Sequence, residues 1–264
     1  MGAEPFDLAG RVAVITGASA GIGAACARRL AARGMMLVLG ARRVGLLQEL
    51  VAELAARQGT RAAALELDVA QAESVARFAR AAEDFAGGVH LLLNNAGFAR
   101  GVARIPTASE ADERDWEEMF AVNVLGLLRV TRRFVPGMVA RDAGHVINMG
   151  SLAGLETYEG GSVYCSTKAS VRIISKALRL ELLGTKVRVT CINPGLVETE
   201  FSVVRLGDRR AADAVYAGMT PLTADEIAAS VEWVAGLPAF MNVEELNLQP
   251  VDQASAQKVH RRNP

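Results

Sequence analysis

The sequence predicts an α/β fold in which a parallel sheet is covered by helices on both of its faces. Short, almost continuously apolar runs alternate with segments of helical periodicity along the whole chain, and strands buried on both faces have this composition. No repeat, linker or low-complexity tract divides the chain, and 51% of its 264 residues are apolar, enough for one sizeable core. We therefore expect one domain over residues 1–264.

Four strands and three helices are expected in the first hundred residues. Each strand is a short run rich in Val, Ile, Leu, Met or Ala, and each helix carries apolar residues at spacings of three and four. The expected strands are 11–15, 35–39, 62–67 and 89–93. Helices are expected at 24–33, around Leu47, Leu50 and Leu54, and around Phe78 and Phe85.

The second half of the chain continues the alternation. A long helix is expected over 116–139, with a kink or an interruption at Pro136 and Gly137, because proline lacks the N–H that a helix interior needs. Thr223 and Glu226 have capping-box spacing and predict the start of another helix. The remaining elements are a helix over 163–183, strands at 145–149, 187–192 and 245–249, and a polar tail, 252–264, expected to be mobile or packed on another subunit.

Composition favours a small-molecule partner. Lys plus Arg and Asp plus Glu both total 29, so no net charge points to nucleic acid or to a membrane surface. The first apolar run is too short for a signal peptide or a membrane span, and the three scattered cysteines suit reduced thiols, so we expect a cytoplasmic protein. His90 and His145 have no further ligands at metal-binding spacing, and no metal is expected.

A glycine-rich turn, 16–23, follows the first strand and opens the first helix. Its glycines, Gly17, Gly21 and Gly23, together with Ser19 and Ile22, predict a dinucleotide site. Glycine lets the backbone approach a pyrophosphate, whose charge is met by the free N–H groups of the helix N-terminus. The alternative is a tight strand-to-helix turn without a ligand.

The choice of cofactor is decided after the second strand. A carboxylate there would bind a ribose 2′-hydroxyl, but the sequence has Arg42 and Arg43. Two guanidinium groups can bind a 2′-phosphate, so NADP is favoured over NAD. The alternative is that one or both arginines only extend from the next helix into solvent.

Tyr164 and Lys168 lie four residues apart in the expected helix 163–183, and therefore on one face of it. A cation beside a phenol favours the phenolate, so we expect Lys168 to lower the pKa of Tyr164 from about 10 and to make it a usable acid or base. Taken alone, the spacing is more typical of a packed tyrosine beside a solvated lysine, and the other motifs of the chain change this interpretation.

The order of further motifs identifies a resemblance. Asn94-Asn95-Ala96-Gly97 follows the fourth strand, Asn123 lies in the long helix, Ser151 follows the fifth strand, and Pro194-Gly195 follows the sixth. With Tyr164 and Lys168, this series resembles the short-chain dehydrogenase/reductase family over nearly the whole chain. The resemblance implies a Rossmann-like three-layer sandwich with a seven-stranded parallel sheet and an NAD(P) cofactor.

The resemblance also implies site residues. The implied catalytic residues are Asn123, Ser151, Tyr164 and Lys168. Beyond the turn and the two arginines, the implied cofactor-binding residues are Asp68, Val69, Asn95, Ala96, Gly97, Tyr164, Lys168, Pro194, Gly195, Val197 and Thr199. Separately, Ser151 could simply cap a loop and Asn123 could satisfy a helix carbonyl.

The chemistry of ketone reduction agrees with this set. A hydride must reach carbon and a proton must reach oxygen, so an acid has to stand within hydrogen-bond reach of the carbonyl oxygen. Tyr164 can donate that proton, and Ser151 can stabilise the developing charge. Lys168 can hold the cofactor ribose, and Asn123 is expected to position a water leading from Lys168 to solvent.

A finer resemblance concerns the substrate. Several short segments look like those of the subgroup of NADP-dependent 3-hydroxy acid and serine dehydrogenases. They are residues 200–205, 207–208 and 161–164, together with Leu237-Pro238 and Asn242-Val243. Residues 199–222 lack clear periodicity and are expected to form a lid. We hypothesise that Arg205 binds a substrate carboxylate; the alternative is a solvated charge.

Two other functions stay open. The chain could be a broad carbonyl reductase of a biosynthetic pathway, or a non-catalytic dinucleotide-binding protein on the same fold. The complete catalytic set favours an enzyme. Many members of the family are tetramers, which implies a homo-oligomer here, with a homotetramer formed through helices 116–139 and 163–183 and the tail strand favoured.

Overall fold

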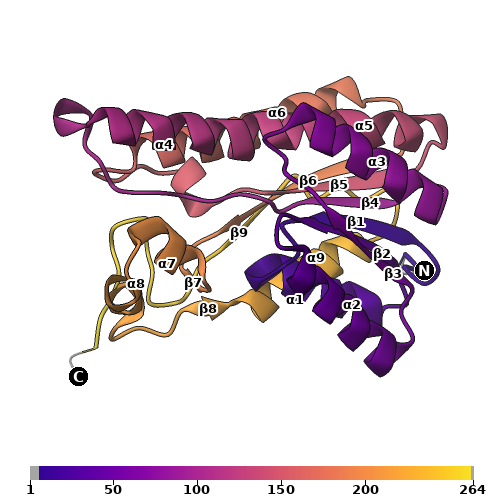
Figure 1. Cartoon of the computed structure of the whole chain (residues 1–264), viewed down its shortest axis with the longest axis horizontal. Coiled ribbons are helices and arrows are strands. Elements are labelled where there is room, and N and C mark those ends of the chain that lie inside the picture. Colours follow the sequence, from indigo (N-terminus) through magenta and orange to yellow (C-terminus); the bar gives the residue numbers. More distant parts are fainter. Residues whose placement is uncertain (1–5, 263–264) are drawn as a thin grey trace.

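A seven-stranded parallel sheet lies at the centre of the computed structural model, which describes residues 6–262 (Figure 1). The strand order is β3-β2-β1-β4-β5-β6-β9, so the order reverses direction between β1 and β4. Every pair of neighbouring strands is parallel. The strands are β1 Val12–Thr16, β2 Met36–Ala41, β3 Ala62–Glu66, β4 Leu91–Asn94, β5 Gly144–Met149, β6 Val187–Pro194 and β9 Glu245–Leu248. The expected parallel sheet and the three-layer Rossmann-like fold are confirmed.

Helices cover both faces of this sheet. In Figure 1, α1 (Gly21–Ala32), α2 (Val44–Gln58) and α9 (Ala224–Ala235) lie below the sheet. The helices α3 (Ala72–Ala86), α4 (Glu110–Phe120), α5 (Leu127–Ala140) and α6 (Ser162–Glu181) lie above it. Successive residues of a strand pack against opposite helix layers, because side chains alternate between the two faces of a sheet. Ile15 packs in the core formed with α1, α2 and α9, whereas Val14 packs in the core formed with α3 and α5.

The long helix expected over 116–139 is divided at a different place. A capping box of Ser109 and Asp112 starts α4 at Glu110, and a π-helical segment, η2 (Ala121–Gly126), separates α4 from α5. Helix α5 continues through Pro136, so an interruption there is wrong, whereas a kink stays a prediction. Both Pro136 and Arg132, whose carbonyl loses its helical partner, are exposed, and water can satisfy that carbonyl.

The C-terminal third adds the segment that was expected to form a lid. It contains α7 (Phe201–Leu206) and α8 (Arg209–Tyr216), flanked by a short parallel pair of β7 (Val197–Glu198) and β8 (Leu222–Thr223). The capping box of Thr223 and Glu226 at the start of α9 is confirmed. Short 3-10 turns, η1 (Ile105–Thr107) and η3 (Leu152–Gly154), follow β4 and β5.

The described part of the polar tail packs on its own chain. Arg261 donates to the carbonyl of Val215 over 3.0 Å, and the N–H of Arg262 donates to the carbonyl of Gly218 over 2.7 Å. The expectation of a mobile tail is therefore wrong for 252–262, whereas packing of the tail on another subunit stays a prediction, and the last two residues lie outside the described range. Over residues 6–262, the helices are all too short or too polar to cross a membrane.

Candidate active site

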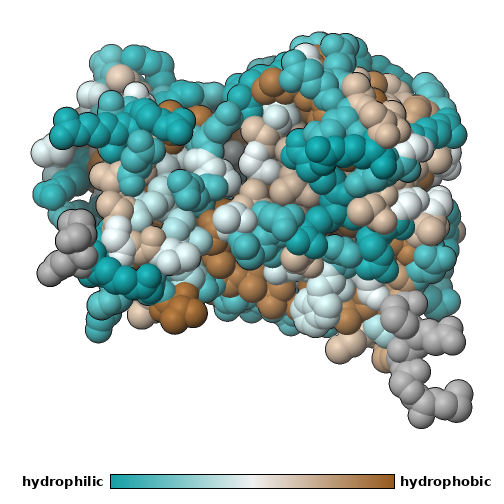
Figure 2. Space-filling view, turned by 90° about the horizontal axis from the view of Figure 1, so that it is seen from below, coloured by the Kyte–Doolittle hydropathy of each residue, from teal (hydrophilic) through white to brown (hydrophobic). Residues whose placement is uncertain are grey.

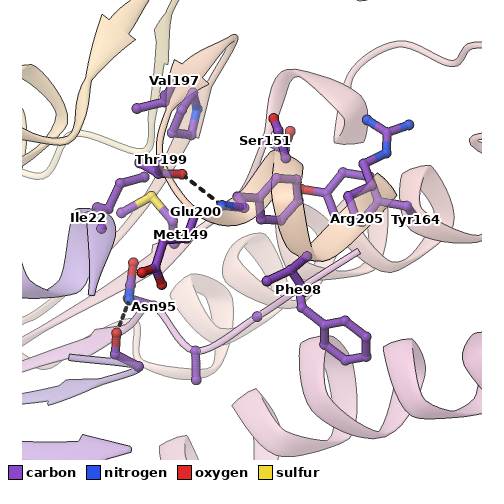
Figure 3. Close-up of a pocket in the computed structure, with 18 of the residues that line it drawn as sticks. Ile22, Asn95, Phe98, Met149, Ser151, Tyr164, Val197, Thr199, Glu200 and Arg205 are labelled. Carbon is purple, nitrogen blue, oxygen red and sulfur yellow. Dashed lines mark hydrogen bonds between the residues drawn. The ribbon is translucent and has the colours of Figure 1, made fainter. Parts of the chain in front are cut away.

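A cavity of about 680 Å³ opens at the carboxyl ends of the strands, where the strand order reverses between β1 and β4. Ligands of open α/β sheets bind at this position. Figure 3 shows Ile22 and Asn95 at one end of the cavity and Ser151, Tyr164 and Arg205 at the other. We call these the turn end and the Tyr164 end.

Nearly all of the sequence-predicted site residues are brought together here. Gly23 and Asn123 are the two that do not line the cavity. The predicted residues that line it are Gly17, Ser19, Gly21, Ile22, Arg42, Arg43, Asp68, Val69, Asn95, Ala96, Gly97, Ser151, Tyr164, Lys168, Pro194, Gly195, Val197 and Thr199.

The glycine-rich turn forms a cradle at the turn end. Gly17 has a positive φ of 66°, and a Cβ there would lie 2.8 Å from the Cα of Ala96. A Cβ on Gly23 would lie 2.4 Å from the carbonyl oxygen of Gly17, so Gly23 allows α1 to pack against the turn. Asn95 fixes the turn by donating from Nδ2 to the carbonyls of Thr16 and Gly17.

The N-terminus of α1 is open toward this cradle. Its N-cap residue, Ala20, makes no side-chain hydrogen bond, and the first turn contains no acidic residue. The first N–H groups of a helix have no partner within the helix and attract anions, so the cradle fits a pyrophosphate.

Arg42 and Arg43 both line the cavity beyond the end of β2, and both are more than half exposed. Arg43 donates from Nε to the hydroxyl of Ser19 over 3.3 Å and from both terminal nitrogens to Glu200. Arg42 lies 4.0 Å from Glu118. Arg43 therefore stands beside the glycine-rich turn, and both arginines face the cavity where a 2′-phosphate needs donors.

Asp68 and Val69 follow β3 on the neighbouring wall. The carboxylate of Asp68 accepts from the N–H of Ala70 over 3.0 Å, and its own N–H donates to the hydroxyl of Ser74. A Cβ on Gly126 would lie 2.7 Å from Val69, so the π-helical segment η2 packs directly against this wall.

Tyr164 and Lys168 lie on one face of α6, but the lysine charge is not directed at the phenol. Lys168 Nζ donates to the carbonyl of Met149 over 2.9 Å and lies 6.0 Å from the centroid of the Tyr164 ring. The ring itself packs 5.7 Å from the ring of Phe201 on α7. Ser151 caps η3 through a hydrogen bond that its hydroxyl accepts from the N–H of Ala153.

Burial dominates the titration of both groups. It raises the pKa of Tyr164 to about 12, against the opposing effects of the Ser151 hydroxyl and the Arg205 charge. It lowers the pKa of Lys168 to about 8. The sequence-based prediction that Lys168 lowers the phenol pKa is therefore wrong, because desolvation is the larger effect and Nζ points to a carbonyl. Tyr164 is consequently a neutral phenol at neutral pH, the form that donates a proton.

Asn123 is buried in η2, and its side chain makes three hydrogen bonds within the protein. Its Oδ1 accepts from the N–H of Phe98 over 3.0 Å, and its Nδ2 donates to the carbonyl of Phe98 and to Thr167. A Cβ on Gly97 would lie 3.1 Å from Asn123 Oδ1 and 3.5 Å from Lys168 Nζ, so the two side chains meet beside Gly97.

Arg205 reaches the Tyr164 end from α7. Its guanidinium lies 5.0 Å from the centroid of the Tyr158 ring, and its carbonyl accepts from the N–H of Gly101 over 2.9 Å. Over residues 6–262, its Nε is buried without a hydrogen-bond partner. The arrangement places a cation in the same cavity as Tyr164, as the carboxylate hypothesis requires.

Sequence reasoning missed several residues that line the cavity, among them Tyr158, Glu200 and Gln253. Gln253 comes from the tail and accepts from the N–H of Leu196 over 2.8 Å. These residues lie in loops, or at the end of a loop, and no periodicity marks such positions. The polar composition of the tail was the one available signal for Gln253.

No group of three or more His, Cys, Asp or Glu side chains that could hold a metal ion gathers in residues 6–262. The three cysteines are free and buried. The Tyr164 end of the cavity presents a phenol, a hydroxyl, an ammonium and a guanidinium group.

Comparisons with known proteins agree with this geometry. Residues 11–208 match the family model described as short chain dehydrogenase. The NADP-dependent 3-hydroxy acid dehydrogenase of Salmonella typhi is 42% identical over 253 residues, covering 95% of this chain and 99% of that protein. Serine 3-dehydrogenase of Rhizobium radiobacter is 39% identical over 244 residues, covering 92% and 95%. The closed form of serine dehydrogenase complexed with NADP+ has a TM-score of 0.86 at 41% identity, covering 95% of this chain and 100% of that one.

Proposed function

The chain belongs to the short-chain dehydrogenase family, and we propose that its substrate is a small 3-hydroxy acid or a serine-like acid. It is an NADP-dependent oxidoreductase that interconverts an alcohol and a carbonyl compound. One observation supports the proposed substrate above all. A proton donor, Tyr164, and a cation, Arg205, share one end of a cavity whose other end is an anion cradle.

The cradle and the two arginines would hold NADP. The N–H groups at the start of α1 would meet the pyrophosphate, and Arg42 and Arg43 would meet the 2′-phosphate. Asp68 and Val69 would hold the adenine, and Asn95 and Gly97 would lie near its ribose. Ala96 would also contact the cofactor, and Thr199 would lie near the nicotinamide carboxamide. Bound NADP supplies the hydride acceptor, or in its reduced form the donor.

Tyr164 would exchange the proton with the substrate oxygen. Because burial holds its pKa at about 12, the neutral phenol is ready to donate during reduction. Ser151 would hydrogen-bond the same oxygen and stabilise the charge that develops on it. Both residues line the Tyr164 end of the cavity.

Lys168 would hold the ribose of the cofactor through its ammonium donors. With Asn123, it would also lead a proton toward solvent through a water near Gly97, where the two side chains meet. The other expected cofactor contacts, Pro194, Gly195 and Val197, lie where β6 ends beside the cavity.

We further propose that segment 199–222 is a lid on a single domain over 1–264, and that Arg205 on this lid binds the substrate carboxylate. A planar guanidinium can bind a carboxylate through two parallel hydrogen bonds. Replacing Arg205 with alanine should lower kcat/KM for a hydroxy acid by at least about tenfold, and much less for its methyl ester.

Arg209 offers a matched control for this substitution. It lies on α8 in the same segment, is highly exposed, and pairs with Asp213. Arg209→Ala should leave the ratio of acid to ester unchanged. Equal losses on acid and ester in Arg205→Ala would contradict the carboxylate role of Arg205.

We propose a homotetramer, with contacts through the layer that carries α4, α5 and α6 and through the tail strand. Large apolar side chains are exposed on that layer, including Leu125, Leu128, Ile173 and Leu180. The opposite face, with α1, α2 and α9, shows apolar patches set among polar residues (Figure 2). Sedimentation equilibrium, with Leu180→Glu as the variant, tests this assembly.

A cytoplasmic location is also proposed. The support is that all three cysteines are free and buried, because reduced thiols persist in a reducing compartment. Fractionation of cells that produce the protein, followed by immunoblotting of each fraction, would test it.

The substrate class is tested most directly by an absorbance screen at 340 nm. The panel contains small 3-hydroxy acids, serine, their methyl esters and simple ketones, each with NADP or NAD. We expect turnover with NADP and a preference for the acids. A preference for uncharged ketones would favour the broad carbonyl reductase, and binding of NADP without any turnover would favour a non-catalytic protein.

A further inference from the structure

We propose that Tyr158 is a positioning residue that determines specificity, because its ring holds the Arg205 guanidinium at the Tyr164 end of the cavity. The inference rests on the proposed function and deepens it, since it explains how a lid arginine is kept ready for a substrate carboxylate. The 5.0 Å separation between guanidinium carbon and ring centroid is within the range of a cation–π contact.

Arg205 differs from other arginines around the cavity in having no anionic partner. Arg42 lies 4.0 Å from Glu118, and Arg43 pairs with Glu200. Within residues 6–262, Arg205 forms neither an ion pair within 4.0 Å nor a hydrogen bond from its side chain. Its charge is therefore available for an anion that enters the cavity.

The backbone of Arg205 is fixed as well as its side chain. Its carbonyl accepts from the N–H of Gly101, which belongs to the segment that follows β4. The ring of Tyr158 comes from a second segment, the one between β5 and α6. Arg205 thus connects α7 to two segments of the sheet-bearing part of the chain.

Tyr158 is itself held in a fixed place. A Cβ on Gly161 would lie 2.1 Å from its ring, so the ring packs directly against the backbone of Gly161 and a larger residue there would displace one of the two. Gly160, with φ of 74°, approaches the carbonyl of Val102, and the ion pair of Arg104 and Glu159 ties the same two segments over 3.0 Å. The ring is therefore a firm platform for the guanidinium.

The hydroxyl of Tyr158 contributes little to this platform. Its oxygen is buried and has no hydrogen-bond partner in residues 6–262, although the Cys165 thiol lies beside it. The aromatic face is the part that contacts Arg205. A substitution that keeps the ring should therefore preserve the contact with Arg205, and a substitution that removes the ring should abolish it.

The charges around the cavity favour an anionic substrate at this end. Two acidic side chains line the cavity, and both are engaged elsewhere: Asp68 by the N–H of Ala70 and Glu200 by Arg43. The Tyr164 end instead contains the cations Lys168 and Arg205. The carboxylate of a small hydroxy acid is an anion that these two cations can bind.

The test compares Tyr158→Leu with Tyr158→Phe as the matched control. We expect Tyr158→Leu to lower kcat/KM for the hydroxy acid by roughly 2- to 30-fold, the range that a cation–π contact spans, mainly through KM. The methyl ester should be affected much less. Tyr158→Phe should keep the acid preference, because the ring remains. Affinity for NADP, measured by fluorescence titration, should be unchanged in both variants.

A double-mutant cycle tests whether Tyr158 acts through Arg205. In an Arg205→Ala background, Tyr158→Leu should cause no further loss specific to the acid. Tyr158→Met carries the same test if the leucine variant does not fold. Equal losses on acid and ester, or a Tyr158→Phe variant as impaired as Tyr158→Leu, would overturn the role of Tyr158. A wild-type protein that turns over none of the panel would instead overturn the proposed function.

Discussion

A carboxylate oxygen of Glu200 lies 3.2 Å from both terminal nitrogens of Arg43, and this ion pair joins the start of α7 to the segment after β2. Arg43 also donates to Ser19 in the glycine-rich turn. The guanidinium of Arg43, which would bind the 2′-phosphate of NADP, is therefore already paired with an acidic side chain of the lid segment.

We predict that Glu200→Gln strengthens the binding of NADP and not that of NAD. The carboxylate competes with the 2′-phosphate for Arg43, and an exposed ion pair is worth about 0.2–1 kcal/mol, so the gain should not exceed about fivefold. Fluorescence titration with both dinucleotides measures the effect. Glu53→Gln, which removes an acid from α2 away from the cavity, is the control. An equal gain for NAD, or weaker binding of NADP, would contradict competition at Arg43.

A second prediction concerns the pH dependence of ketone reduction. Burial lowers the pKa of Lys168 to about 8, so the lysine is charged below that pH and loses its charge above it. The pKa of Tyr164, raised to about 12, keeps the phenol protonated throughout this window. The rate should therefore be level below about pH 7 and should fall above about pH 8.

The variant Lys168→Arg tests whether the fall in rate above pH 8 comes from Lys168, because a guanidinium stays charged to high pH. Whatever its absolute rate, the arginine variant should lose the decline that begins near pH 8. Initial rates in buffers from pH 6 to 10 provide the profile. If the decline stays at the same pH in the variant, a group other than Lys168 is responsible.

The third prediction concerns stability and follows from His145. This side chain is fully buried on β5 beside Arg188, and both burial and that charge hold its pKa well below the ordinary value. Its Nε2 lies 2.8 Å from the hydroxyl of Thr190, which donates to the carbonyl of Val243, so the imidazole is the donor in that contact. The folded protein therefore keeps His145 neutral.

The unfolded chain takes up a proton at His145 as the pH falls through about 6.5, and the folded chain does not. The free energy of unfolding should therefore decrease below pH 6.5, by up to about 1.4 kcal/mol per pH unit from this residue. Urea unfolding at pH 7.5 and 5.5 should show a smaller decrease in His145→Gln. His260→Gln, at an exposed position, should behave as wild type. The account fails if both variants show the same pH dependence as wild type.

The elements of the fold were predictable because the strands are buried on both faces. Val14 and Ile15 are neighbours that pack into opposite cores, and such strands read as continuous apolar runs in the sequence. The π-helical segment η2 was not predictable from the local sequence pattern. Gly126 packs against Val69 from a distant part of the chain, and no local pattern marks that contact.

Much of the candidate site could also be predicted, since its residues follow strands whose carboxyl ends meet in space. Tyr158, Glu200 and Gln253 escaped prediction because loops and the tail bring them to the cavity. The direction of the Tyr164 pKa shift was mispredicted for a similar reason. Spacing placed Lys168 on the correct face of α6, but burial and the direction of Nζ are set by the rest of the fold.

The central claim is that the phenol of Tyr164 exchanges the proton with the substrate oxygen. The most direct measurement is the turnover of Tyr164→Phe, with the dissociation constant of NADP measured on the same preparation. Loss of a general acid should lower kcat by about 10²- to 10⁴-fold, while NADP binding stays within about twofold of wild type. A phenylalanine variant that reduces or oxidises the substrate at the wild-type rate would contradict the claim.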